Sequence, residues 1–140
     1  MFVVISSEAN NEGFQMKKVS AAILSIVFSQ STLAITREEA VNNWVEKNAQ
    51  QEWGLCSATS IEIRGATAGT ASDSLTQRLN MVDGVMRMAR VRLTQKGISS
   101  SSLDNIQQAA FNANKAKDAK AKGLIFNNCV GTVNDAAQGK

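Results

Sequence analysis

The stretch "SLTQRLNMVDGVMRMARVRLTQKG", residues 74–97, carries the clearest folding signal in the chain. Its apolar side chains recur every three or four residues, a spacing that places them on one face of an α-helix. Ser74 and Gln77 stand at the spacing of a capping box, and Gly97 suits a helix end. The stripe that we expect to be buried consists of Leu75, Leu79, Val82, Val85, Met86, Ala89 and Leu93. The stretch therefore predicts an amphipathic helix with one face in a core.

The two sides of this stripe differ in chemistry. One side carries Asp83, which stands one turn before Arg87 and is expected to neutralise that arginine in part. The other side carries methionines, whose flexible thioethers adapt to a neighbouring helix or to a partner surface. The candidate partner-binding residues on the two sides are Arg87, Arg90, Arg92, Met81 and Met88.

The segment before it, residues 35–66, also shows a helical repeat, and a capping box begins at Thr36. Asn48 and Glu52 interrupt the apolar stripe of this segment, and Gly54 follows. We therefore expect two helices or one kinked helix here. The expected buried positions are Val41, Trp44, Val45, Leu55, Cys56, Thr59, Ile63 and Ala66.

The chain after residue 97 continues the helical pattern. The stretch "ISSSSLDN", residues 98–105, is expected to be a loop that ends in a serine cap. The inward positions beyond it are Leu103, Ile106, Ala110 and Phe111, followed by a last stripe of Phe126, Cys129, Val130, Val133 and Ala137. The chain has no proline, so long helices run uninterrupted. These patterns predict an all-α fold, a compact bundle of four to five helices.

Residues 16–34, "MKKVSAAILSIVFSQSTLA", have the parts of a secretory signal peptide. Two lysines precede an apolar run of about ten residues, against roughly twenty for a membrane-spanning helix. Thr32 and Ala34 occupy the small-residue positions before a cleavage site. We therefore expect a signal peptide at 16–34 that begins at the true initiator, Met16, so that residues 1–15 are an extension from a wrongly assigned start. A single helical domain at 35–140 is expected in the periplasm. No stable membrane anchor is expected after cleavage.

The chain has two cysteines, Cys56 and Cys129. In a reducing compartment they are expected to be free thiols, and in an oxidising one a disulfide. Given the predicted export we expect the disulfide, which closes the bundle. Its loop of 73 residues corresponds to about 4 kcal/mol in chain-entropy terms.

The composition argues against an enzyme. The chain lacks histidine, the commonest general base and metal ligand, and it lacks tyrosine. No metal or cofactor is expected. The early carboxylates, Glu38, Glu39, Glu46, Glu52 and Glu62, are spread as on a solvated face. The net charge of +3 is too weak to indicate nucleic acid. The lysines of the polar segment near residue 118 point in different directions around a helix; they are Lys115, Lys117, Lys120 and Lys122.

A cleaved signal, about a hundred mature residues, all helices, and a disulfide from "EWGLCSAT" to "FNNCVGTV" together resemble the periplasmic immunity proteins of type VI secretion. The resemblance implies a protein that binds a secreted peptidoglycan-hydrolase effector and blocks its active cleft. Lysozyme-like hydrolases use acidic catalytic residues. The clustered arginines Arg87, Arg90 and Arg92 are therefore expected to enter the active cleft of the effector. The pattern is also compatible with a homodimer.

Two alternatives come from other functional classes. One is a small periplasmic stress chaperone that opens at low pH, although the absence of histidine removes the easiest trigger near pH 6. The other is an envelope adaptor protein with no inhibitory role. Complex formation with one partner, rather than suppression of aggregation, separates the immunity protein from the chaperone.

Overall fold

The computed structural model describes residues 9–10, 13–14 and 35–140. The chain divides into two units, Met1–Thr36 and Arg37–Lys140. In the first unit, strand β1 (Ala9–Asn10) pairs antiparallel with strand β2 (Gly13–Phe14). The expected signal peptide at 16–34 lies outside the described residues, and so does most of the expected extension at 1–15; both remain predictions.

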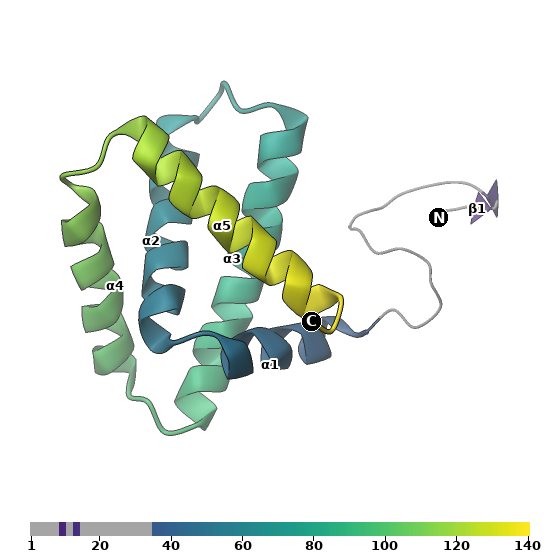
Figure 1. Ribbon diagram of the computed structural model, residues 1–140, viewed down its shortest axis with the longest axis horizontal. Helices are drawn as coiled ribbons and strands as arrows, with labels where there is room; N and C mark the ends of the chain where they lie inside the picture. Colours follow the sequence, from purple (N-terminus) through teal and green to yellow (C-terminus); the bar gives the residue numbers. More distant parts are fainter. Residues whose placement is uncertain (1–8, 11–12, 15–34) are drawn as a thin grey trace. The chain divides into compact units, whose positions relative to one another are not determined.

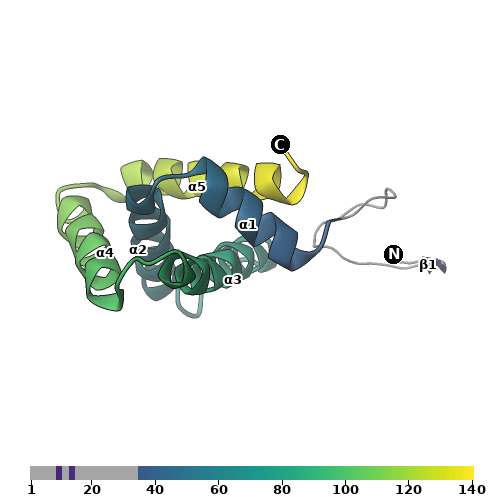
Figure 2. The same ribbon diagram turned by 90° about the horizontal axis from the view of Figure 1, so that it is seen from below.

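The second unit confirms the predicted all-α bundle (Figure 1). Its helices are α1 (Arg37–Lys47), α2 (Gln50–Ala66), α3 (Asp73–Gln95), α4 (Ser100–Asn114) and α5 (Ala119–Ala137). Helix α2 contacts α3, α4 and α5, whereas α4 packs mainly on α2 and lies at the edge of the bundle in both views (Figure 2). The expected break before α2 falls at residues 48–49, so the first segment forms two helices.

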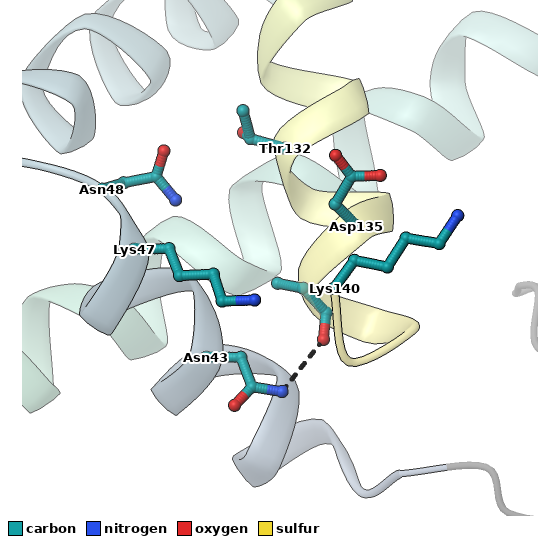
Figure 3. Close-up of a pocket in the computed structure, with 7 residues that line it drawn as sticks. Asn43, Lys47, Asn48, Thr132, Asp135 and Lys140 are labelled. Atoms are coloured by element: carbon teal, nitrogen blue, oxygen red, sulfur yellow. Dashed lines mark hydrogen bonds between the residues drawn. The ribbon is translucent and has the colours of Figure 1, made fainter.

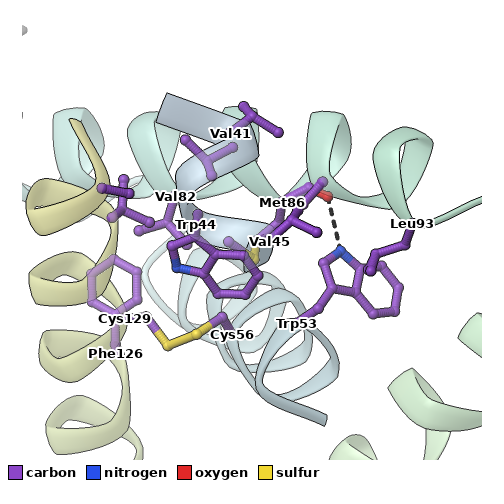
Figure 4. Close-up of a cluster of buried hydrophobic side chains, with 14 of the residues drawn as sticks. Val41, Trp44, Val45, Trp53, Cys56, Val82, Met86, Leu93, Phe126 and Cys129 are labelled. Carbon is purple, nitrogen blue, oxygen red and sulfur yellow. Dashed lines mark hydrogen bonds between the residues drawn. A yellow bond between two sulfur atoms is a disulfide. The ribbon is translucent and has the colours of Figure 1, made fainter. Parts of the chain in front are cut away.

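The core lies where α1, α2, α3 and α5 meet (Figure 4). The predicted stripe of α3 is confirmed at Leu79, Val82, Val85, Met86, Ala89 and Leu93, which are buried, whereas Leu75 is only partly buried. Two tryptophans fill the space between helices and each satisfies its indole N–H. Trp53 donates to the Met86 carbonyl oxygen at 2.9 Å, and Trp44 donates to Thr132 Oγ1 at 3.0 Å. Large aromatic area is thereby buried without leaving a polar group unpaired.

The predicted disulfide is present between Cys56 of α2 and Cys129 of α5, with 5.7 Å between their Cα atoms (Figure 4). Both residues are fully buried. The bond ties the central helix to the last helix of the bundle.

Two predicted helix starts are corrected by the structure. Helix α3 is capped by Ser72, whose hydroxyl accepts from the Leu75 amide at 3.1 Å, and not by Ser74. Helix α4 is capped by Ser99, so the serines at 100–102 form its first turn instead of a loop. In both cases the capping serine has extended backbone angles, the conformation that an N-cap requires.

The seam between α2 and α4 is built from small and polar groups. Asn114 is fully buried and donates to Thr59 Oγ1 at 3.0 Å and to Glu62 Oε1 at 3.2 Å. Gln107 donates to Ser57 Oγ at 3.1 Å. Gly54, expected to mark a break, lies inside α2, where its missing side chain lets α4 approach closely. Buried hydrogen bonds therefore join α4 to α2 beside the apolar contacts of Leu103 and Ile106.

Candidate interaction surface

The outer face of α3 carries an uncovered strip, which we call the α3 ridge and define as Gly84, Arg87 and Val91. These residues are spaced three and four apart, so they share the face opposite the buried stripe. Val91 is 57% exposed, and among the residues that the structure describes it is one of three large exposed hydrophobic residues. A Cβ atom on Gly84 meets nothing within 4 Å. The ridge is therefore open to a partner along about two helical turns.

Arg87 is the charged member of the ridge. It is exposed, and it makes no hydrogen bond or ion pair within the part of the chain that the structure describes. The pairing with Asp83 that the spacing predicts is not formed. Asp83 instead accepts from Ser60 Oγ at 2.5 Å and from Arg64 Nε at 2.9 Å, both on α2. The guanidinium of Arg87 thus keeps its hydrogen-bond donors for solvent or a partner.

Arg90, a second predicted site residue, holds the fold together. Its Nη2 atom donates to Asp104 Oδ1 at 2.9 Å and to Ser100 Oγ at 2.7 Å, which joins α3 to the start of α4. The guanidinium carbon also lies 5.6 Å from the centre of the Trp53 ring, within the range of a cation–π contact. Arg90 is 30% exposed and already has its partners.

The other three predicted residues, Arg92, Met81 and Met88, also make contacts within the bundle. Arg92 donates from Nε to Asn42 Oδ1 at 3.0 Å and so links α3 to α1. Met81 and Met88 are partly buried and pack against the core. The structure therefore leaves Arg87 alone among the five as an exposed side chain without an intramolecular partner in the described residues. Val91 is not among the partner-binding residues predicted from the sequence, although its place opposite the buried stripe marks it as an outward apolar residue.

Some of the other charged groups also have partners within the fold. Glu46 lies 3.6 Å from Lys96, and Glu62 lies 3.3 Å from Lys122. Lys117 donates to the Ala113 carbonyl oxygen at 3.2 Å. Pairs of this kind at a surface contribute little stability each. They nevertheless agree with the interpretation of these side chains as solvated or structural.

One group of possible metal ligands occurs among the described residues: Glu52, Cys56 and Cys129, with ligand atoms within 4.8 Å of one another. Both sulfur atoms are committed to the disulfide, and metal binding requires thiolates. In this oxidised form the group therefore offers a metal only a carboxylate.

A pocket of about 260 Å³ lies between α1 and the end of α5 (Figure 3). Its lining consists of Asn43, Lys47, Asn48, Thr132, Asp135, Ala136 and Lys140. Asn43 spans it by donating to the Ala136 carbonyl oxygen at 3.2 Å. The lining mixes lysine ammonium groups, amides, one carboxylate and the Thr132 hydroxyl. That hydroxyl donates to the Cys129 carbonyl oxygen and accepts from Trp44, so it is not paired with a base. The α3 ridge, and not this pocket, is therefore the candidate functional site.

Within the residues that the structure describes, no helix is both long enough and apolar enough to cross a membrane. Comparisons of the chain with protein-family models, with curated proteins and with solved structures gave no match.

Proposed function

We propose that the protein is a periplasmic immunity protein that binds a cell-wall-degrading effector of type VI secretion and inhibits it by blocking its active cleft. The observation that carries this proposal is the α3 ridge, where Arg87 has no internal partner in the described residues and Val91 is 57% exposed. Arginine is enriched among protein–protein hot spots, and Val91 adds an exposed apolar contact beside it.

Charge complementarity supports the choice of partner. Glycan-cleaving hydrolases commonly place two carboxylates beside the bond that they cut. A guanidinium matches a carboxylate through two parallel hydrogen bonds, and Arg87 is the arginine of α3 that has these donors free. Because Val91 follows one turn later, the same ridge brings an apolar contact beside the charged one.

The build of the bundle supports inhibition by a rigid surface. The buried disulfide joins α2 to α5, and the Arg90–Asp104 ion pair joins α3 to α4. A preorganised surface loses little conformational entropy when it binds. Helix α3 is thus presented by a scaffold that does not need to rearrange.

The proposal includes export through the signal-like segment at 16–34. A disulfide is retained in an oxidising compartment and is rare in a reducing one. The Cys56–Cys129 bond is consistent with the periplasm, where enzymes that cut the cell wall act.

The test begins with a tagged chain purified from the periplasm and used to capture partners from a lysate of its own host. A captured hydrolase is then assayed on purified peptidoglycan with increasing amounts of the protein. We expect inhibition to saturate at one equivalent. Capture of many unrelated clients instead indicates the chaperone, and a captured envelope protein without hydrolase activity indicates the adaptor.

Charge reversal then tests the α3 ridge. We expect Arg87→Glu to weaken inhibition by about tenfold or more, because a carboxylate replaces the guanidinium at the contact. Lys120→Glu is the matched control, since it makes the same charge change at an exposed position on α5. If Arg87→Glu inhibits the hydrolase as fully as the wild type, the α3 ridge is not the surface that blocks the active cleft.

A further inference from the structure

The disulfide has a carboxylate as its neighbour. Glu52 stands one turn before Cys56 on α2, and its Oε2 atom lies 3.7 Å from Cys56 Sγ. Glu52 forms no ion pair with a lysine or arginine within the residues that the structure describes. A carboxylate without a cationic side-chain partner in the described residues therefore lies against the sulfur pair.

Access to the sulfurs is also restricted. Cys56 and Cys129 are both fully buried, whereas Glu52 is partly exposed. A reductant reaches the bond only after a local opening, and it then meets the carboxylate beside Cys56. Because the medium around a buried bond screens charge less than water does, the repulsion there is stronger than at an open surface.

We propose that Glu52 shields the Cys56–Cys129 disulfide from reduction by thiolates in the folded protein. Attack on Cys56 brings the anionic sulfur of the reductant toward the carboxylate. Attack on Cys129 makes Cys56 the leaving thiolate, and its new negative charge forms beside the same carboxylate. Glu52 therefore disfavours reduction of the disulfide whichever of the two sulfur atoms the thiolate attacks.

Dithiothreitol is a suitable probe, and its reaction balances as follows. One thiolate of the reductant attacks a cystine sulfur, the S–S bond breaks, and the other cysteine leaves as a thiolate and takes up a proton. The second thiol of the reductant loses its proton, attacks the mixed disulfide and releases the remaining cysteine. Two electrons pass to the protein, and dithiothreitol becomes a cyclic disulfide.

The experiment compares the wild-type protein with Glu52→Gln and with Glu38→Gln. The control removes the same charge from an exposed position at the start of α1. Reduction is followed in native buffer by alkylation and intact mass. We expect Glu52→Gln to be reduced about three- to tenfold faster than the wild type, and Glu38→Gln at the wild-type rate.

Two further measurements isolate the charge effect. In a denaturing concentration of urea the three proteins are expected to be reduced at the same rate, because the folded neighbourhood is lost. With tris(3-hydroxypropyl)phosphine, a neutral reductant, no anion approaches the carboxylate, although attack on Cys129 still releases the Cys56 thiolate beside it. Glu52→Gln is therefore expected to accelerate reduction of the native protein less with the phosphine than with dithiothreitol. The inference is overturned by equal native rates with dithiothreitol, by an equal acceleration with the phosphine, or by an acceleration that matches a measured loss of folding stability.

Discussion

The contact of α2 with α4 at Gly54 predicts a large effect from a single methyl group. Gly54 lies inside α2 and faces α4, and a Cβ atom placed on it comes within 2.6 Å of Ile106 Cγ2. The same atom lies 3.0 Å from the Ile106 carbonyl oxygen and 3.2 Å from its carbon. Two of the three obstacles are backbone atoms, and the third belongs to a β-branched side chain with little rotamer freedom in a helix. In Gly54→Ala the two helices must therefore move apart.

The magnitude follows from two opposing effects. Overpacking a well-packed contact costs about 1–3 kcal/mol, and obstruction by backbone favours the upper part of that range. Alanine stabilises a helix interior by about 1 kcal/mol relative to glycine. We expect Gly54→Ala to lose about 1–2 kcal/mol of unfolding free energy. For a domain of about a hundred residues that loss lowers the Tm by roughly 5–15 °C.

The assay is urea unfolding followed by circular dichroism, with Gly131→Ala as the matched control. Gly131 lies in the interior of α5, is exposed, and has nothing within 4 Å of an added Cβ. The control is therefore expected to gain up to about 1 kcal/mol from helix propensity alone. A Gly54→Ala protein as stable as the wild type refutes the close approach of α2 and α4.

Two further predictions concern stability. The double substitution Cys56→Ala/Cys129→Ala is expected to lose about 4 kcal/mol in urea unfolding, since the bond closes a loop of 73 residues; a loss below about 1 kcal/mol contradicts its role as a staple. Asn114→Ala removes the donor to Thr59 and Glu62 at a fully buried position and is expected to cost about 1–3 kcal/mol. The exposed Asn112→Ala is the control for this second change, and equal losses in the two proteins contradict a buried polar seam.

The sequence predicts most of the fold because its signals are local. The stripe of α3 is periodic over the whole helix, so one face is specified whatever it packs against. The central helix was harder to predict. Helix α2 contacts three other helices, and its residues Cys56 to Ser60 are buried without interruption. A single stripe does not describe such a helix. For this reason the buried positions predicted from the sequence do not include Trp53, and the interruption predicted near Gly54 is absent.

Helix caps show a second limit of local reasoning. Ser72 and Ser74 both precede the α3 pattern, and Ser74 has the better capping-box spacing to Gln77. The structure uses Ser72, with extended backbone angles and a bond to the Leu75 amide. The two choices shift the start of the helix by two residues but leave its buried face unchanged. Such errors affect boundaries and not the fold.

The candidate site depends on tertiary packing in a way that spacing does not reveal. Three arginines follow one another closely along α3, and from sequence the nearest counter-charge is Asp83, one turn before Arg87. In the folded chain Asp83 accepts a hydrogen bond from Arg64 on α2, and Arg90 donates to Asp104 of α4. The residue that spacing marks as neutralised is therefore the one left without a partner in the described residues. An outward arginine becomes available for binding only where no neighbouring helix supplies an acceptor, and on α3 that condition is met at Arg87.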